Sequence, residues 1–221
     1  MTARIAAYLE IGSKRAFAGA LDWPGWCRSG RPEERALAAL VEYGPRYARV
    51  VGGLKPRFVP PIDVAGLDVV ERLPGDATTN FGAPAAAPGA DAEPVGTRDA
   101  TRLLAILGAC WSALDAAVEA AAGRELVKGP RGGGRSVEKI VDHVVGAEGG
   151  YLARIGRRFD ATGLGIADVA TASLGEVEAA IRDGVPPSPR GGKRWTVRYF
   201  VRRSAWHILD HAWEIEDRTG H

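Results

Sequence analysis

The sequence predicts a chain of two parts that differ in fold class. The first is a small α+β domain over residues 1–73, and the second is an all-α four-helix bundle of up-down-up-down order over residues 97–221. Short apolar runs separated by turn residues dominate the first part, whereas apolar residues recur at helical spacing through the second. Residues 74–96, between them, are rich in proline, glycine and alanine and are predicted to be a linker.

The overall composition excludes several classes of protein. The 221 residues are 46% hydrophobic with a net charge of +2, which indicates a globular protein and argues against a dedicated nucleic-acid binder. Two distant cysteines, Cys27 and Cys110, exclude a disulfide scaffold and favour a cytoplasmic location. No apolar run reaches the roughly 20 residues of a membrane helix, and no secretory signal is evident. The expected partner is a small molecule, and a homodimer is left open.

In the first part, a sheet of three or four strands is expected, and three of its segments are 5–10, 15–21 and 67–73. Pro24 and Gly25 follow the second segment and mark a turn. A helix is predicted over 32–43, where apolar residues recur at helical spacing, and Pro45 ends or kinks it. A second helical piece is predicted at 47–54.

Four amphipathic helices are predicted after the linker. Thr97, Ser136 and Thr196 are expected to cap the first, second and fourth of them, because a hydroxyl oxygen can accept a hydrogen bond from a free backbone N–H. The third helix runs over about 169–184. Each helix has an apolar stripe along one face, and a four-helix bundle buries four such stripes most simply.

Three of the four histidines lie in these helices and indicate a metal site. His207 and His211 are four residues apart, so their imidazoles project from one face of the fourth helix, and His143 lies on the second helix. Three imidazoles are a common donor set for a divalent metal and leave coordination positions open. On the residues alone an alternative remains. His143 is then a hydrogen-bonded core histidine, and His207 and His211 lie at the surface by chance.

Two segments resemble the DinB-like superfamily of four-helix-bundle metalloproteins: VDHVVGAEGGYLARI (141–155) and WTVRYFVRRSAWHILDHAWEIEDR (195–218). The resemblance covers about residues 97–221. It implies one divalent metal bound by His143 on the second helix and by His207 and His211 on the fourth. Zinc is the preferred ion, with nickel or iron as alternatives. Characterised members include thiol-dependent transferases and isomerases, so the resemblance also implies a low-molecular-weight thiol cosubstrate.

The first part has a resemblance of its own, carried by a short motif: Trp23-Pro24-Gly25-Trp26, then Gly30, Glu34 and Ala36-Leu37. It is similar to HicB-like domains, in which a small sheet leads through a Pro-Gly turn into a helix. Such antitoxins usually append a DNA-binding segment, and here a helical bundle stands in its place. The resemblance therefore implies a partner-binding module, or a wall over the pocket of the bundle, rather than an antitoxin.

The loops before the second and fourth helices are rich in cations. In an up-down-up-down bundle these helices begin at the same end, so both loops are expected at one mouth, above His143. Helix N-termini and cations at one mouth would attract an anionic substrate or thiol. The alternative is that both are ordinary solvated loops. The predicted anion-binding residues are Arg131, Arg135, Arg190 and Arg194, with Lys128 and Lys193 nearby.

Three further polar residues lie at helical spacing from the histidines and are candidates for catalysis. Glu214 could orient an imidazole or act as a base, Arg203 could pair with an anionic substrate, and Tyr151 could line the cavity. The alternative for each of them is a role in packing or at the surface. The resulting functional expectation is a thiol-dependent S-transferase or isomerase with an open metal site. The alternatives are a metal-dependent hydrolase and a non-enzymatic binding or antitoxin-like protein.

Overall fold

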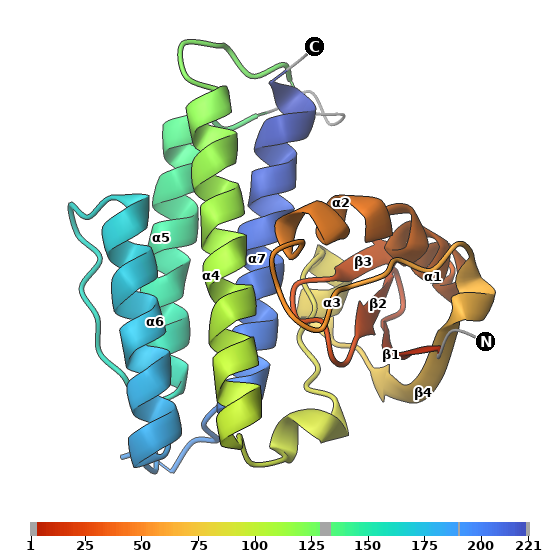
Figure 1. The fold of residues 1–221 in the computed structure, drawn as a ribbon, viewed down its shortest axis with the longest axis horizontal. Coiled ribbons are helices and arrows are strands. Elements are labelled where there is room, and N and C mark those ends of the chain that lie inside the picture. The colour runs from red at the N-terminus through yellow and green to blue at the C-terminus, as the bar shows by residue number, and fades with distance from the viewer. Residues whose placement is uncertain (1–3, 129–133, 190, 220–221) are drawn as a thin grey trace. The chain divides into compact units, whose positions relative to one another are not determined.

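The computed structural model describes residues 4–128, 134–189 and 191–219. The chain divides into two compact units, Met1–Pro94 and Val95–His221. The first contains a sheet with helices and the second contains long helices only, so the predicted α+β layout is confirmed at this level (Figure 1).

The first unit is built on a four-stranded sheet of order β3-β2-β1-β4. Strand β1 pairs antiparallel with β2 and parallel with β4, and β2 pairs antiparallel with β3. Helix α1 packs against β2 and β3. The bounds are β1 Ile5–Ile11, β2 Ala16–Ala20, β3 Cys27–Gly30, β4 Leu67–Pro74, α1 Glu33–Glu42 and α2 Gly44–Val50. Strand β3 was not predicted, and α2 begins three residues before the predicted helical piece at 47–54.

An aromatic cluster forms part of the core of this unit and immobilises the Pro-Gly turn. Trp26 donates its indole N–H to the carbonyl oxygen of Leu40 at 2.8 Å, and Tyr47 donates its hydroxyl to the carbonyl oxygen of Pro24 at 2.8 Å. Phe58 packs edge-on against both Trp26 and Tyr47. Gly25 has a φ of 92°, a left-handed conformation that glycine adopts without steric cost. The turn therefore holds the sheet against α1 and α2.

The prediction of a linker over residues 74–96 is wrong for most of that segment. Helix α3 (Ala77–Phe81) and the 3-10 turn η2 (Gly89–Ala92) lie within it, and residues up to Pro94 belong to the first unit. The fully buried carboxylate of Glu10 accepts hydrogen bonds from the Thr79 hydroxyl and from the backbone N–H groups of Ala85 and Ala86. A proline- and glycine-rich stretch is thus held by a buried side chain of β1.

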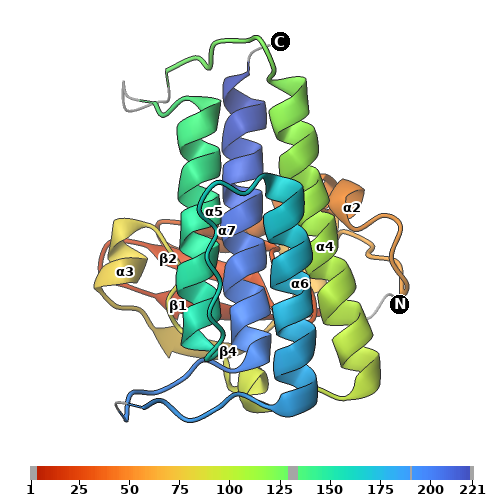
Figure 2. The ribbon, with the colours of Figure 1, turned by 90° about the vertical axis from the view of Figure 1, so that its left-hand side faces the viewer.

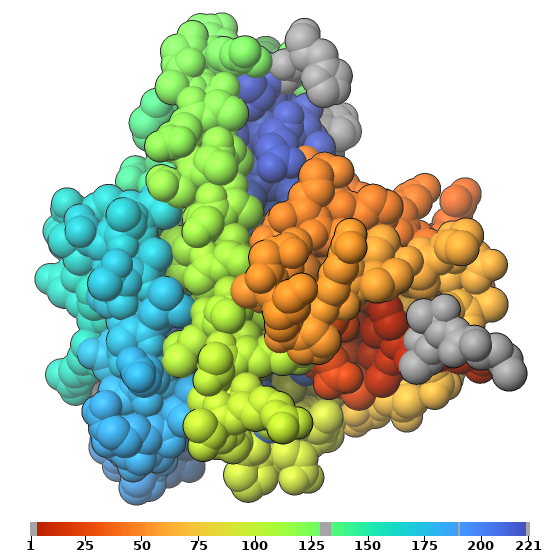
Figure 3. All heavy atoms as spheres, viewed as in Figure 1, coloured from red at the N-terminus to blue at the C-terminus, as the bar shows by residue number. Residues whose placement is uncertain are grey.

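The second unit contains the four predicted helices: α4 Thr97–Ala120, α5 Val137–Arg154, α6 Ile166–Asp183 and α7 Val197–Arg218. Two predicted caps are confirmed, since Ser136 Oγ accepts from the N–H of Lys139 and Thr196 Oγ1 accepts from the N–H of Tyr199. Thr97 is the first residue of α4 rather than its cap, which is Gly96. Helix α4 packs against both α6 and α7 (Figure 3).

The predicted up-down-up-down order is wrong, because α5 and α6 run in the same direction. Arg157, just after α5, pairs with Asp183 at the end of α6, and the N–H of Trp195, just before α7, donates to the carbonyl oxygen of Arg154. Helices α4 and α7 both begin at one end, where Arg198 pairs with Asp99. The order is therefore up-down-down-up, and the connection 155–165 runs back along the bundle to the start of α6 (Figure 2).

The length of this connection explains the misprediction. Extended chain covers about 3.3 Å per residue, so residues 155–165 can span roughly 36 Å. An α-helix of the length of α5 spans about 27 Å at 1.5 Å per residue. The connection can therefore return along the whole bundle, and no local signal distinguishes this path from a tight turn.

Helix α4 is the candidate membrane span among the described residues, by length and composition alone. Buried core helices have the same length and composition, so this finding assigns no membrane. The buried side chains of α4 are Leu103, Ile106, Leu107, Cys110, Trp111, Leu114 and Ala117.

Candidate metal centre

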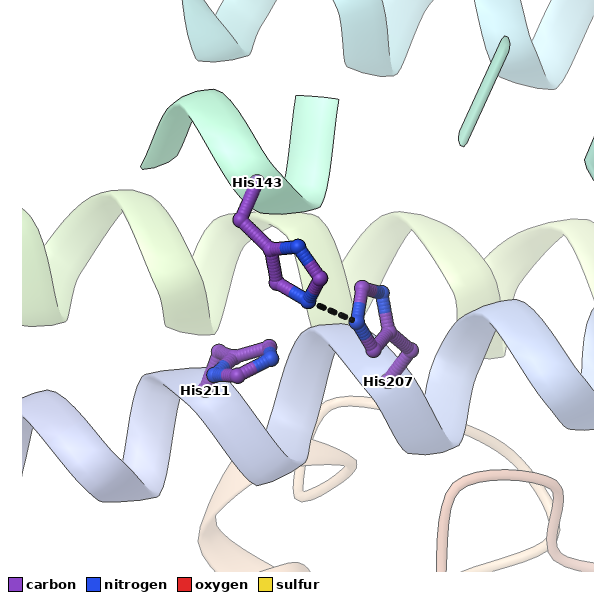
Figure 4. A group of neighbouring side chains, drawn as sticks. All are labelled: His143, His207 and His211. Atoms are coloured by element: carbon purple, nitrogen blue, oxygen red, sulfur yellow. Dashed lines mark hydrogen bonds between the residues drawn. The ribbon is translucent and has the colours of Figure 1, made fainter. Parts of the chain in front are cut away.

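Three histidines from two antiparallel helices converge on one point of the second unit. His143 projects from α5, and His207 and His211 project from α7 (Figure 4). Their ligand nitrogens all lie within 4.8 Å of one another, and the Nε2 atoms of His143 and His207 are 3.1 Å apart. The convergence follows from helix geometry, because residues four apart share a face of α7 and α5 packs alongside it.

This spacing suits a single divalent cation. Nitrogens bound tetrahedrally at about 2.0–2.1 Å from an ion lie roughly 3.3 Å from one another. The 3.1 Å separation of His143 and His207 is close to that value. Three protein ligands leave at least one coordination position, and His143 is exposed whereas His207 and His211 are buried. The residues present therefore fit a three-histidine site that a small molecule can reach from the His143 side.

Burial and neighbouring positive charge keep the imidazoles of His143 and His207 neutral. Desolvation is the main cause that lowers the pKa of His207, to about 2, with further contributions from His211, Arg203 and His143. Desolvation also lowers the pKa of His143. A neutral imidazole has a free nitrogen lone pair, and this is the form that binds a metal.

Glu214 and Arg218 orient one of the three imidazoles. Glu214 Oε2 lies 2.8 Å from Nδ1 of His211, and Arg218 donates to Glu214 Oε1 at 2.8 Å. Arg218 also donates to the carbonyl oxygens of Val127 and Arg135, both at 3.0 Å. The contact with His211 is the main cause that lowers the pKa of Glu214. Since Nδ1 is engaged, Nε2 of His211 remains for a metal, and Glu214 is placed to orient this ligand.

The other two predicted catalytic residues lie beside the cluster. The ring of Tyr151 is 5.6 Å from the ring of His207, and the guanidinium of Arg203 lies 5.1 Å from the centre of the Tyr151 ring. Burial raises the pKa of Tyr151. Arg203 also lies 4.6 Å from the centre of the Trp206 ring. The structure thus brings Tyr151, Arg203 and Glu214 to the same seam between α5 and α7.

The expected cationic mouth is not formed, because the order of the helices separates the two loops. Arg135 lies near the end of α7, where its carbonyl oxygen accepts from Arg218. Arg194 lies at the opposite end of the seam and donates to the carbonyl oxygen of Ala153. Lys128 belongs to the loop of Arg135, and Lys193 to that of Arg194. Arg131 and Arg190 lie outside the described residues.

One of these cations still acts on the histidines. The positive charge of Arg135 contributes to the lowered pKa of both His143 and His207. Arg135 and Arg218 also line a cavity of about 680 Å³ between the end of α4 and the start of α5.

Sequence reasoning missed the buried carboxyl group of Glu148. It lies between three helices, where it accepts hydrogen bonds from Ser173 of α6 and from Ser204 of α7, the latter at 2.6 Å. Burial raises its pKa to about 6. The available signal was its position, four residues after Val144 and four before Leu152 on the buried stripe of α5. A glutamate in such a stripe must be either neutral or well bonded.

No protein-family model, curated protein or solved structure matches this chain.

Proposed function

We propose that the second unit is a metal-dependent enzyme that activates a nucleophile at a zinc ion held by His143, His207 and His211. The observation that carries this proposal is the convergence of three ring nitrogens within 4.8 Å, one of them on an exposed histidine. A site closed by four protein ligands is typical of a structural metal, whereas three ligands and an open position are typical of a catalytic one.

The nucleophile we propose is the thiol of a low-molecular-weight cosubstrate, which is transferred to or added to an electrophilic carbon. A divalent ion at this site supplies Lewis acidity that favours the deprotonated form of a thiol or a water. The resemblance of residues 141–155 and 195–218 to thiol-dependent bundle enzymes favours the thiol. Hydrolysis by water would use the same centre, and the assay below separates the two reactions.

Each residue of the seam has a defined part in this proposal. The three histidines hold the ion through unprotonated ring nitrogens. Glu214 bonds Nδ1 of His211 and so keeps this histidine in the tautomer whose Nε2 is free to bind the ion. Arg218 holds Glu214 in place through the connection between α4 and α5. The ring of Tyr151 packs edge-on against His207 and would help to hold this ligand in place.

The first test is the metal content of tag-free protein, measured by mass spectrometry on the wild type and on His143→Ala and His207→Ala. We expect about one equivalent of metal in the wild type and its loss in both variants. Lys139→Ala, an exposed change one turn from His143, is the matched control and keeps the metal. Glu214→Gln retains the ligands but weakens metal affinity about 10- to 100-fold, measured by competition with a coloured chelator.

The second step is an assay of the loaded protein with electrophiles, with and without added thiol. Metal-dependent consumption of thiol supports the proposed transfer, whereas product formation without thiol supports hydrolysis. A wild-type protein that takes up no metal, even after reconstitution, contradicts the proposed function.

A further inference from the structure

A stripe of polar residues runs along α7 and continues on both sides of the histidines. Its members are spaced by four, four, three and four positions, so they share one face of the helix. Adjacent members are one turn, about 6 Å, apart. The stripe consists of Arg203, His207, His211, Glu214 and Arg218.

The two ends of this stripe differ in how their arginines are bonded. Arg218 is fully engaged, with Glu214 and with two carbonyl oxygens. Arg203 lies against the rings of Tyr151 and Trp206, and its Nη1 atom is buried without a hydrogen-bond partner in the described part of the chain. No carboxylate of the described residues pairs with it, unlike Arg198, which pairs with Asp99.

A buried guanidinium nitrogen without a partner is costly, because this nitrogen has given up hydration and received no hydrogen bond in return. Stacking on aromatic rings stabilises the faces of the guanidinium. A hydrogen bond with the Tyr151 hydroxyl engages part of its edge, and the buried Nη1 atom remains for a ligand. Two parallel N–H groups match the two oxygens of a carboxylate. Arg203 therefore has the surroundings of a residue that receives an anion.

We propose that Arg203 is the carboxylate-binding residue of this site. It would hold the carboxylate of a ligand whose reacting atom lies at the three-histidine centre, about one helical turn or 6 Å away. This inference rests on the proposed function and narrows its substrate class to small organic acids. The carboxylate belongs either to the thiol cosubstrate or to the electrophile, and the shared chemistry is the same in both cases.

The test uses the full-length protein loaded with cobalt, in which a bound thiolate produces a charge-transfer absorption. The probes are 3-mercaptopropionate and 3-mercaptopropionamide, which have similar size and differ in charge. We expect the wild type to bind the carboxylate probe about 10-fold or more tightly than the amide. Arg203→Met removes this preference and leaves amide affinity and cobalt content unchanged, and Arg182→Met, on the exposed side of α6, keeps the preference.

A second arm identifies the source of the carboxylate. Propionate is titrated into cobalt protein saturated with 2-mercaptoethanol. If propionate binds in an Arg203-dependent way without displacing this neutral thiol, the carboxylate belongs to the electrophile. If instead propionate does not bind, and Arg203 favours the carboxylate only in 3-mercaptopropionate, the carboxylate belongs to the thiol.

A third arm needs no metal, so it separates failure of this inference from failure of the proposed function. Propionate is titrated into metal-free protein while the arginine Nε–H signals are followed by NMR, with Arg203→Met identifying the signal of Arg203. We expect that signal to shift. An unshifted signal, or equal preference of the wild type and Arg203→Met for the carboxylate probe, overturns the proposal. Loss of cobalt binding alone contradicts only the proposed function.

Discussion

At the scale of single residues, the buried carboxyl group of Glu148 makes the stability of the bundle depend on pH. Its pKa is raised from 4.5 to about 6 in the folded state. Folding therefore favours the protonated form, and the contribution is complete below pH 4.5 and is lost as the pH rises through about 6. A shift of this size corresponds to about 2 kcal/mol.

The test of this dependence is Glu148→Gln, which preserves the shape and can still bond Ser173 and Ser204. We expect the free energy of unfolding of the variant, relative to the wild type, to increase by about 2 kcal/mol between pH 4.5 and pH 7.5. Urea unfolding at both pH values measures this difference, and the contributions of all other titratable groups cancel because they are the same in both proteins. Glu178→Gln, an exposed change on α6, is the control. A constant difference across this range would mean that the pKa of Glu148 is the same in the folded and the unfolded protein.

At the scale of elements, the attachment of residues 77–92 to the sheet depends on Glu10. Glu10→Ala removes the acceptor of the Thr79 hydroxyl and of the Ala85 and Ala86 N–H groups. Donors buried without partners cost about 1–3 kcal/mol each. We expect loss of protection of the Ala85 and Ala86 amides in hydrogen exchange on the full chain.

Glu71→Ala, which removes a more exposed acceptor of Gly89, has a smaller effect confined to residue 89. Equal protection in Glu10→Ala and wild type would show that backbone packing alone holds the segment.

The elements themselves were largely predictable, because their signals are local. Ser136 and Thr196 mark helix starts through bonds that reach only three residues. The apolar stripe of each long helix is likewise a property of its own residues. The attachment of residues 77–92 was not predictable, because it depends on a carboxylate some 70 positions earlier in the chain. A pattern of prolines and glycines cannot show such a contact.

At the scale of the whole molecule, the division of the chain predicts that the second unit folds alone. His143, His207 and His211, with Glu214 and Arg218, all lie after Val95. We expect a fragment of residues 95–221 to be helical by circular dichroism and to bind about one equivalent of metal, with its His207→Ala variant as the metal-free control. A fragment that folds but lacks the metal present in the whole chain would show that the first unit contributes to the site.

The sequence by itself determined the division into an α+β part and a helical part, the positions of the four long helices and the identity of the three histidines. These depend on composition, caps and periodicity, which act over a few residues.

Only the tertiary structure decided the direction of α6, and with it the separation of Arg135 from Arg194. It also decided that Arg203 lies over the ring of Tyr151, and that Glu148 is buried with Ser173 and Ser204 as its partners. These contacts join residues of different helices, and their geometry follows from how the long connection 155–165 returns and from how buried polar groups find partners across the bundle.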